Sequence, residues 1–181
     1  MYIEAICGSP RRGNTEWMLE TLLGAAAGTG AKTSLFRLRN ISLKPCRGCL
    51  ACEKRDEHGA GNCNIDDDVR TILPELLAAD VIVLGTPGYM GLLSGLLKTF
   101  LDRTCPVWPA LKGKGLAGIA VAEEDSCAAI PNIRTYGKLL GMQWLGSVIA
   151  LAKLPKEASR IPGLEKRLQR LGNKLAVRPS S

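Results

Sequence analysis

Short apolar runs alternate with helical patterns along most of this 181-residue chain. The clearest run, Asp80 to Gly85, holds Val-Ile-Val-Leu without polar alternation, as in a strand that is covered on both faces. Soon after it, leucines and a phenylalanine between Leu93 and Leu101 follow the spacing of an amphipathic helix. This alternation predicts an α/β protein in which right-handed crossovers join parallel strands, with helices on both faces of the sheet.

The same patterns predict where each element lies. We expect five strands, at residues 2–7, 33–38, 80–85, 115–122 and 144–152. We expect helices at residues 15–27, 66–79, 93–101 and 131–140, and a last one around Leu164 to Leu175. Asn14 or Thr15 is the expected N-cap of the first helix, and Pro74 is expected to bend or shorten the second. Residues 1–181 are predicted to form a single domain with a cysteine-rich insertion at about 44–65.

Composition narrows the class of protein. Hydrophobic residues make up 46% and charged residues 23%, which is typical of a globular chain and not of a disordered one. The apolar runs are far shorter than the roughly 20 residues of a membrane span. The first residues also lack a secretory signal. We therefore expect a cytoplasmic protein without a membrane partner.

The net charge of +7 is concentrated at one end of the chain. From Lys153 onward there are eight basic and two acidic residues, whereas the preceding part holds 16 basic and 15 acidic. Leucines at helical spacing there predict an amphipathic helix whose basic side chains lie on its solvent-exposed face. We expect no nucleic-acid partner; an acidic electron-transfer protein docking on this face is the alternative reading.

The loop after the first strand, Gly8 to Thr15, predicts an anion site. Its glycines, hydroxyls and arginines lead directly into a helix, where free N–H groups and the helix dipole favour a phosphate. Gly8 and Gly13 have the spacing of a P-loop, but Asn14-Thr15 stands where that motif needs lysine, and the dinucleotide fingerprint is absent. A nucleotidase or kinase that acts on the β- or γ-phosphate is therefore poorly supported. An ordinary glycine-rich turn remains the alternative to an anion site.

The loop after the third strand, Thr86 to Gly91, combines a proline, two glycines and a tyrosine. Such a loop lets the backbone pack closely against a flat ring, although Pro-Gly is also common turn chemistry. Because it lies one crossover from the phosphate loop, the pair of loops suggests a mononucleotide at the edge of the sheet.

Four of the seven cysteines fall within eighteen residues, at Cys46, Cys49, Cys52 and Cys63. The close triplet with a more distant fourth thiol is typical of a [4Fe–4S] site. A zinc site, with His58 as a substitute ligand, and a loop of free thiols are the alternatives. Lys44, Arg47, Lys54 and Arg55 would favour thiolates there. Cys7 is expected in the core, and no role is assigned to Cys105 or Cys127.

These motifs, in this order, resemble the flavodoxin-like NADPH-dependent FMN reductases, and in particular their iron–sulfur flavoprotein branch. The resemblance rests on residues 8–15, the Pro45-Cys46-x-x-Cys49-x-x-Cys52 triplet, Cys63 with the acids at 66–68, residues 79–80 and 85–89, and Asp102-Arg103. It covers about residues 1–150. It implies a flavodoxin-like three-layer sandwich with a five-stranded parallel sheet, FMN bound non-covalently, and a homodimer or homotetramer.

The resemblance also implies roles for individual residues. Ser9, Arg11, Gly13, Asn14 and Thr15 would hold the FMN phosphate, and Pro87, Gly88, Tyr89, Met90 and Gly91 would line the isoalloxazine ring. The gap before Cys63 is longer than the family usually has. The acidic stretch Glu123 to Asp125 replaces a loop that is often glycine-rich, and carboxylates beside a reduced flavin would lower its potential.

The resulting hypothesis is a flavin-dependent oxidoreductase without an acid–base catalyst of its own. NAD(P)H is the expected donor and a small molecule the expected acceptor; with a cluster, a ferredoxin-like carrier would exchange single electrons with FMN. A flavodoxin-like electron carrier without reductase activity and a zinc-binding interaction module are the two alternatives.

Overall fold

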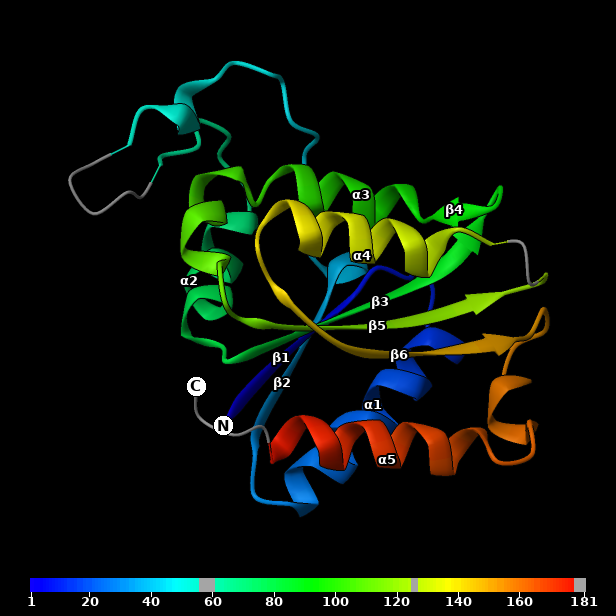
Figure 1. The fold of residues 1–181 in the computed structure, drawn as a ribbon. Helices are drawn as coiled ribbons and strands as arrows, with labels where there is room; N and C mark the ends of the chain where they lie inside the picture. The colour runs from blue at the N-terminus through cyan, green and yellow to red at the C-terminus, as the bar shows by residue number, and fades with distance from the viewer. Residues whose placement is uncertain (56–60, 125–126, 178–181) are drawn as a thin grey trace.

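A computed structural model of the chain describes residues 1–55, 61–124 and 127–177. Its sheet has the strand order β2-β1-β3-β5-β6, and these five strands are parallel (Figure 1). They span Tyr2–Cys7 (β1), Lys32–Arg37 (β2), Val81–Tyr89 (β3), Gly115–Ala122 (β5) and Gln143–Leu151 (β6). A two-residue strand, β4 (Leu92–Leu93), pairs antiparallel with the end of β3.

Helices cover both faces of the sheet (Figure 1). On one face lie α1 (Asn14–Gly28) and α5 (Leu164–Ala176); on the other lie α2 (Val69–Ala78), α3 (Gly95–Asp102) and α4 (Ala129–Leu139). The described residues also include the short 3-10 helices η1 (Leu38–Asn40), η2 (Ala51–Glu53), η3 (Cys105–Leu111) and η4 (Ala158–Arg160). The predicted three-layer sandwich with a five-stranded parallel sheet is confirmed.

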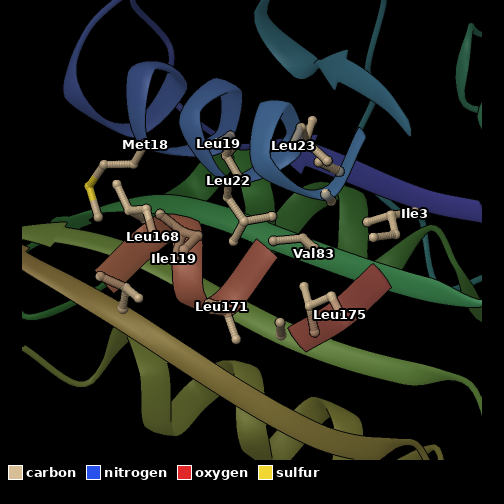
Figure 2. Close-up of a cluster of buried hydrophobic side chains, with 14 of the residues drawn as sticks. Ile3, Met18, Leu19, Leu22, Leu23, Val83, Ile119, Leu168, Leu171 and Leu175 are labelled. Atoms are coloured by element: carbon tan, nitrogen blue, oxygen red, sulfur yellow. The ribbon is translucent and has the colours of Figure 1, made fainter. Parts of the chain in front are cut away.

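Each face of the sheet has its own hydrophobic core. Figure 2 shows the core beneath α1 and α5, where Leu22 and Leu171 meet Ile119 of the sheet. The two helices pack very closely, since a Cβ at Gly172 would lie 2.3 Å from the carbonyl oxygen of Leu22. Burial of the leucine face of α5 leaves its basic residues outside, as its periodicity predicts.

Several details of the predicted elements differ in the structure. The first helix has Gly13, not Asn14 or Thr15, at its N-cap position, and no side chain caps it. The helix expected from Leu93 begins at Gly95, because Leu93 pairs with Gly88 in β4 and Ser94 caps the helix. The third strand continues to Tyr89, through residues expected in a loop. Pro74 lies inside α2, which continues past it to Ala78.

Within the described residues, no helix is both long enough and apolar enough to cross a membrane.

Candidate functional site

A polar hollow lies at the carboxyl ends of β1, β3, β5 and β6, where ligands bind in open parallel sheets. The loop after β1 forms one side, the end of β3 another, and the segments after β5 and β6 close it. Its lining residues are Ser9, Arg11, Arg12, Gly13, Asn14, Thr15, Pro87, Gly88, Tyr89, Val121, Ala122, Glu123, Ala152, Lys153 and Pro155. The tertiary structure thus brings together the two loops that the sequence marked separately.

The loop after β1 has the features of an anion cradle. The Ser9 hydroxyl donates to the carbonyl of Arg11 at 2.7 Å, which folds the loop into a tight turn. Arg11 and Arg12 are exposed at its rim, whereas Ser9 and Thr15 are buried. No described side chain caps the amino end of α1, so its first N–H groups are available to an anion.

Asn14 lines the same hollow, and its side-chain amide also forms hydrogen bonds with the backbone of the protein. Its Nδ2 donates to the carbonyl of Leu154 at 2.9 Å, and its Oδ1 accepts from the N–H of Ala158. These bonds tie the start of α1 to the segment after β6. Asn14 therefore shapes the hollow through the backbone that it holds, in addition to any contact with a ligand.

The residues expected to line a flat ring form a β-hairpin. Tyr89 pairs with Leu92, and Met90 and Gly91 form the two-residue turn, both with positive φ (50° and 76°). Pro87, Gly88 and Tyr89 line the hollow, while Met90 is 98% exposed at the tip of the hairpin. The tip is held by the N–H of Ala128, which donates to the carbonyl of Gly91 at 2.6 Å. The Met90 side chain faces solvent within a single chain.

Sequence reasoning missed two buried hydroxyls that hold this edge together. The Ser94 hydroxyl accepts from the N–H of Leu97 and donates to the carbonyl of Gly8 at 2.7 Å, while the Ser94 N–H donates to Thr86 Oγ1 at 2.9 Å. Gly8 is required there, because a Cβ would lie 2.6 Å from that of Leu97. The Ser-Gly-Leu-Leu start of α3 is an N-cap signal that could have identified Ser94.

The acidic segment after β5 is partly neutralised. Glu123 lines the hollow, and its carboxylate lies 3.1 Å from Nζ of Lys153, which follows β6. Glu124 instead lines a neighbouring hollow with Cys127 and Arg167. Asp125 lies outside the described residues. A lysine that the sequence does not place near this segment therefore offsets the negative charge nearest the hollow.

In the cysteine segment, residues 44–65, the described residues 44–55 and 61–65 leave the three layers on the side of α2 and α3 (Figure 1). α3 begins beside the β4 hairpin and ends just before Cys105, against which this segment docks. The segment and the polar hollow thus lie at opposite ends of α3, whose 8 residues make it about 12 Å long. His58, the substitute metal ligand, is outside the described residues.

A buried ion pair anchors the segment at its two ends. Arg103 and Asp67, whose side chains are 1% and 0% exposed, contact each other at 2.6 Å. Arg103 also donates to the carbonyl of Lys44, and Asp67 accepts from the N–H of Lys44 at 2.9 Å. Burial opposes the charged carboxylate, but these hydrogen bonds and the guanidinium charge outweigh it and lower the pKa of Asp67. Of the three acids at 66–68, Asp67 is therefore chiefly an anchor.

The four thiols predicted to bind metal are not gathered at one point. Cys46 and Cys49 are exposed, and Cys52 and Cys63 are partly buried. Burial, together with the neighbouring thiols of Cys105 and Cys63, raises the pKa of Cys52 to about 11. Over the described ranges, no three His, Cys, Asp or Glu residues are arranged to hold a metal ion.

The basic residues of the segment are also used differently from what we expected. Arg55 donates to the carbonyls of Cys105 and Pro106, and its guanidinium lies 5.5 Å from the centre of the Trp108 ring. The Lys44 ammonium donates to the carbonyl of Asp66.

A second hollow, of about 930 Å³, lies between α3, α4 and η3. Its rim carries large apolar side chains that are exposed in the single chain: Leu92 (53%), Trp108 (43%) and Leu139 (78%). It contains none of the predicted site residues.

An open parallel sheet of this strand order, with a polar hollow at its carboxyl edge, defines a flavodoxin-like α/β protein. Solved structures agree in fold: a flavone reductase has a TM-score of 0.76 at 19% identity, over 97% of this chain and 62% of that chain. A flavodoxin from the domain Archaea has a TM-score of 0.65 at 16% identity, over 97% and 96%.

Residues 1–154 match the family described as NADPH-dependent FMN reductase, and the chain belongs to that family. Its relatives include an iron-sulfur flavoprotein of Methanocaldococcus jannaschii, 38% identical over 67% of this chain and 61% of the relative. An iron-sulfur flavoprotein of Archaeoglobus fulgidus is 36% identical over 58% of this chain and 49% of the relative. The match thus spans about half to three fifths of these relatives' length. The suspected family and its iron–sulfur flavoprotein branch are confirmed.

Proposed function

We propose that the chain is an FMN-dependent oxidoreductase that takes electrons from NAD(P)H and passes them to a small-molecule acceptor. The observation that carries the proposal is the hollow in which the uncapped start of α1 and the Ser9–Gly13 loop face Pro87, Gly88 and Tyr89. A phosphate group suits the first side and a flat ring suits the second. Bound FMN would supply hydride and single-electron transfer, chemistry that no side chain provides.

The residues present fit this cofactor in both charge and shape. Arg11 and Arg12 supply two cations at the phosphate side, and the N–H groups of α1 supply donors. On the ring side, the backbone at Gly88 is held close to the thiol of Cys127, since a Cβ there would lie 2.4 Å from its Sγ. The chain itself would bind and orient the cofactor. The ion pair of Glu123 and Lys153 would set the charge around the ring.

The phosphate contact can be tested by comparing FMN with riboflavin, which lacks the phosphate. Fluorescence titration should give much tighter binding of FMN, and Arg11→Ala should weaken FMN binding roughly 10–100-fold, the loss of one charge-assisted hydrogen bond, while leaving riboflavin binding unchanged. Lys32→Ala removes one cation at the opposite end of the sheet and is the matched control. Equal affinity for the two flavins would contradict the proposed site.

A reductase and a pure electron carrier differ in turnover. The reductase oxidises NADPH continuously when a dye acceptor is supplied, whereas the carrier alternative predicts no steady turnover. The family description favours the reductase.

A metal centre at Cys46, Cys49, Cys52 and Cys63 remains a prediction, supported by four clustered thiols and by relatives named iron-sulfur flavoproteins. The thiols as placed do not fit a cluster, and we route no step of the reaction through one. Iron, sulfide and zinc content of anaerobically purified protein decides among a [4Fe–4S] cluster, zinc and free thiols. Zinc without iron or flavin would favour the interaction-module alternative.

We also propose self-association as a homodimer or homotetramer, through the hollow between α3 and α4. Leu139, 78% exposed, and Trp108 supply apolar surface that a second copy would cover. Light scattering on Leu139→Asp should give a smaller assembly than the unaltered chain. A ferredoxin-like partner is proposed only if the cluster is found.

A further inference from the structure

A fully buried carboxyl group lies near the amino ends of the strands, at the opposite edge of the sheet from the polar hollow. Glu4 in β1 is 0% exposed, and its Oε1 has no hydrogen-bond partner among the described residues. Within that part of the chain, no lysine or arginine forms an ion pair with it. A buried carboxylate without a cation is costly, and such a group is stabilised by keeping its proton.

The Tyr2 hydroxyl contacts two carboxyl groups at once. Its Oη lies 2.6 Å from Oε2 of Glu4 and 2.9 Å from Oε2 of Glu75 in α2, both within hydrogen-bond distance. A tyrosine hydroxyl has a single hydrogen, and an ionised carboxylate has none. Two hydrogen bonds at these distances therefore require a second hydrogen, carried by one of the two carboxyl groups.

Burial identifies Glu4 as the group that keeps this hydrogen. Glu75 is partly exposed, so water can solvate its charge, whereas Glu4 is enclosed. Burial raises the pKa of Glu4, and so does the charge of Glu75, against the neighbouring hydroxyls of Tyr2 and Ser34, which lower it. Burial and the two carboxyl groups also raise the pKa of Tyr2, so its hydroxyl keeps its own hydrogen.

The other charged groups around this cluster are engaged elsewhere. The Lys32 ammonium on β2 lies 4.4 Å from the centre of the Tyr2 ring. Asp80, just before β3, accepts from the N–H of Tyr2 at 2.7 Å and lies 3.9 Å from the amino terminus. Lys114, just before β5, donates to two carbonyls at the end of α2. The proton is therefore the positive charge that the buried carboxyl group has available.

We propose that Glu4 holds a proton at neutral pH and that this proton links β1 to α2: Glu4 donates to Tyr2 Oη, and Tyr2 donates to the Glu75 carboxylate. When alkali removes the proton, which passes to solvent, two carboxylates without a paired cation face each other across Tyr2. The contact between β1 and α2 is then weakened. The amino edge of the sheet thus responds to pH in the direction opposite to the Asp67 anchor, and this response does not depend on FMN binding.

The pH dependence of unfolding tests this assignment on the full chain. Because folding raises the pKa of Glu4, its contribution is complete below the unfolded value of about 4.3 and disappears as the pH rises through the folded value. In urea, the unfolding equilibrium constant of the unaltered chain should rise relative to that of Glu4→Gln by up to about tenfold per pH unit over this range. Glu75→Gln is the matched control. It should retain the rise, which ends at a lower pH because one negative charge beside Glu4 is lost.

Infrared spectroscopy detects the proton itself. The carbonyl band of a protonated carboxylic acid should be present at neutral pH in the unaltered chain and in Glu75→Gln, and absent in Glu4→Gln. Should Glu4→Gln fail to fold, the spectra of the other two chains still decide. The proposal would be overturned by a folded, unaltered chain without this band, by loss of the band in Glu75→Gln, or by parallel unfolding profiles of the unaltered chain and Glu4→Gln.

Discussion

The phosphate loop, residues 8–15, and the cysteine segment, residues 44–65, are held in different ways. The first continues a central strand and is fixed by short backbone contacts, such as the 2.7 Å bond from the N–H of Gly8 to the carbonyl of Gly85. The described residues of the second pair with no strand of the main sheet, and they are held by Arg103 and Asp67 at the ends of the segment and by Arg55 near its middle.

This difference separates two kinds of site. Close packing around Gly8 and Ser94 keeps the loop in one conformation, which suits recognition of a rigid phosphate. The described part of the cysteine segment is anchored by polar contacts of Arg103, Asp67 and Arg55. Four predictions test this contrast, in order of decreasing effect.

Arg103→Met should have the largest effect, a loss of about 3–5 kcal/mol in the free energy of unfolding, because it leaves the Asp67 carboxylate buried without its partner. Urea denaturation measures it. Lys98→Met breaks the exposed Lys98–Asp102 pair on the same helix and should cost less than about 1 kcal/mol. Equal losses of unfolding free energy in the two variants would contradict a special contribution of the buried pair.

Gly8→Ala should cost about 1–3 kcal/mol, since the new methyl group would overlap Leu97 and force the loop away from α3. FMN affinity should fall with stability, because the same movement displaces the phosphate loop. Gly24→Ala is the control: it lies within α1 with no atom within 4 Å of the new Cβ, and should stabilise the chain by about 0.5–1 kcal/mol. A stable Gly8→Ala chain with full FMN affinity would contradict this packing argument.

Acid should weaken the anchor of the cysteine segment. The pKa of Asp67 is lower in the folded chain than in the unfolded one, so its contribution is complete above about pH 4 and disappears as the pH falls through the folded value. A pKa that is lower by one in the folded chain corresponds to about 1.4 kcal/mol of stability at neutral pH. Asp67→Asn should be less stable than the unaltered chain at neutral pH. Its free energy of unfolding, measured at intervals of about one pH unit, should fall less steeply between pH 5 and 2. Parallel pH curves for both chains would exclude Asp67 as the titrating anchor.

Glu123→Gln should have the smallest effect. It removes an exposed carboxylate paired with Lys153 at the hollow, which leaves one more net positive charge beside the flavin site. FMN affinity should rise by roughly fivefold or less, the range of an exposed charge, and the flavin potential should rise. Glu165→Gln, on the exposed face of α5, is the control. A lower affinity in Glu123→Gln would show that the carboxylate supports the site through Lys153.

The two regions also differ in how far they could be predicted. The phosphate loop is local: Gly8 to Thr15 is contiguous, and its place at the end of a buried strand follows from hydrophobic pattern alone. The hairpin at Met90 was missed because Thr86 to Tyr89 has the composition of a loop, and only pairing with Leu92 and Leu93 extends the strand. Ser94 and Thr86 were missed because their partners come from other elements.

By itself, the sequence determined the layers, the strand positions and the family, since strands covered on both faces leave unbroken apolar runs and helices covered on one face leave a helical period. Only the tertiary structure decided that Arg103 meets Asp67 and that Lys153 faces Glu123. These are single contacts between residues distant in the chain. Their energies depend on burial and on precise placement, which no local pattern of residues encodes.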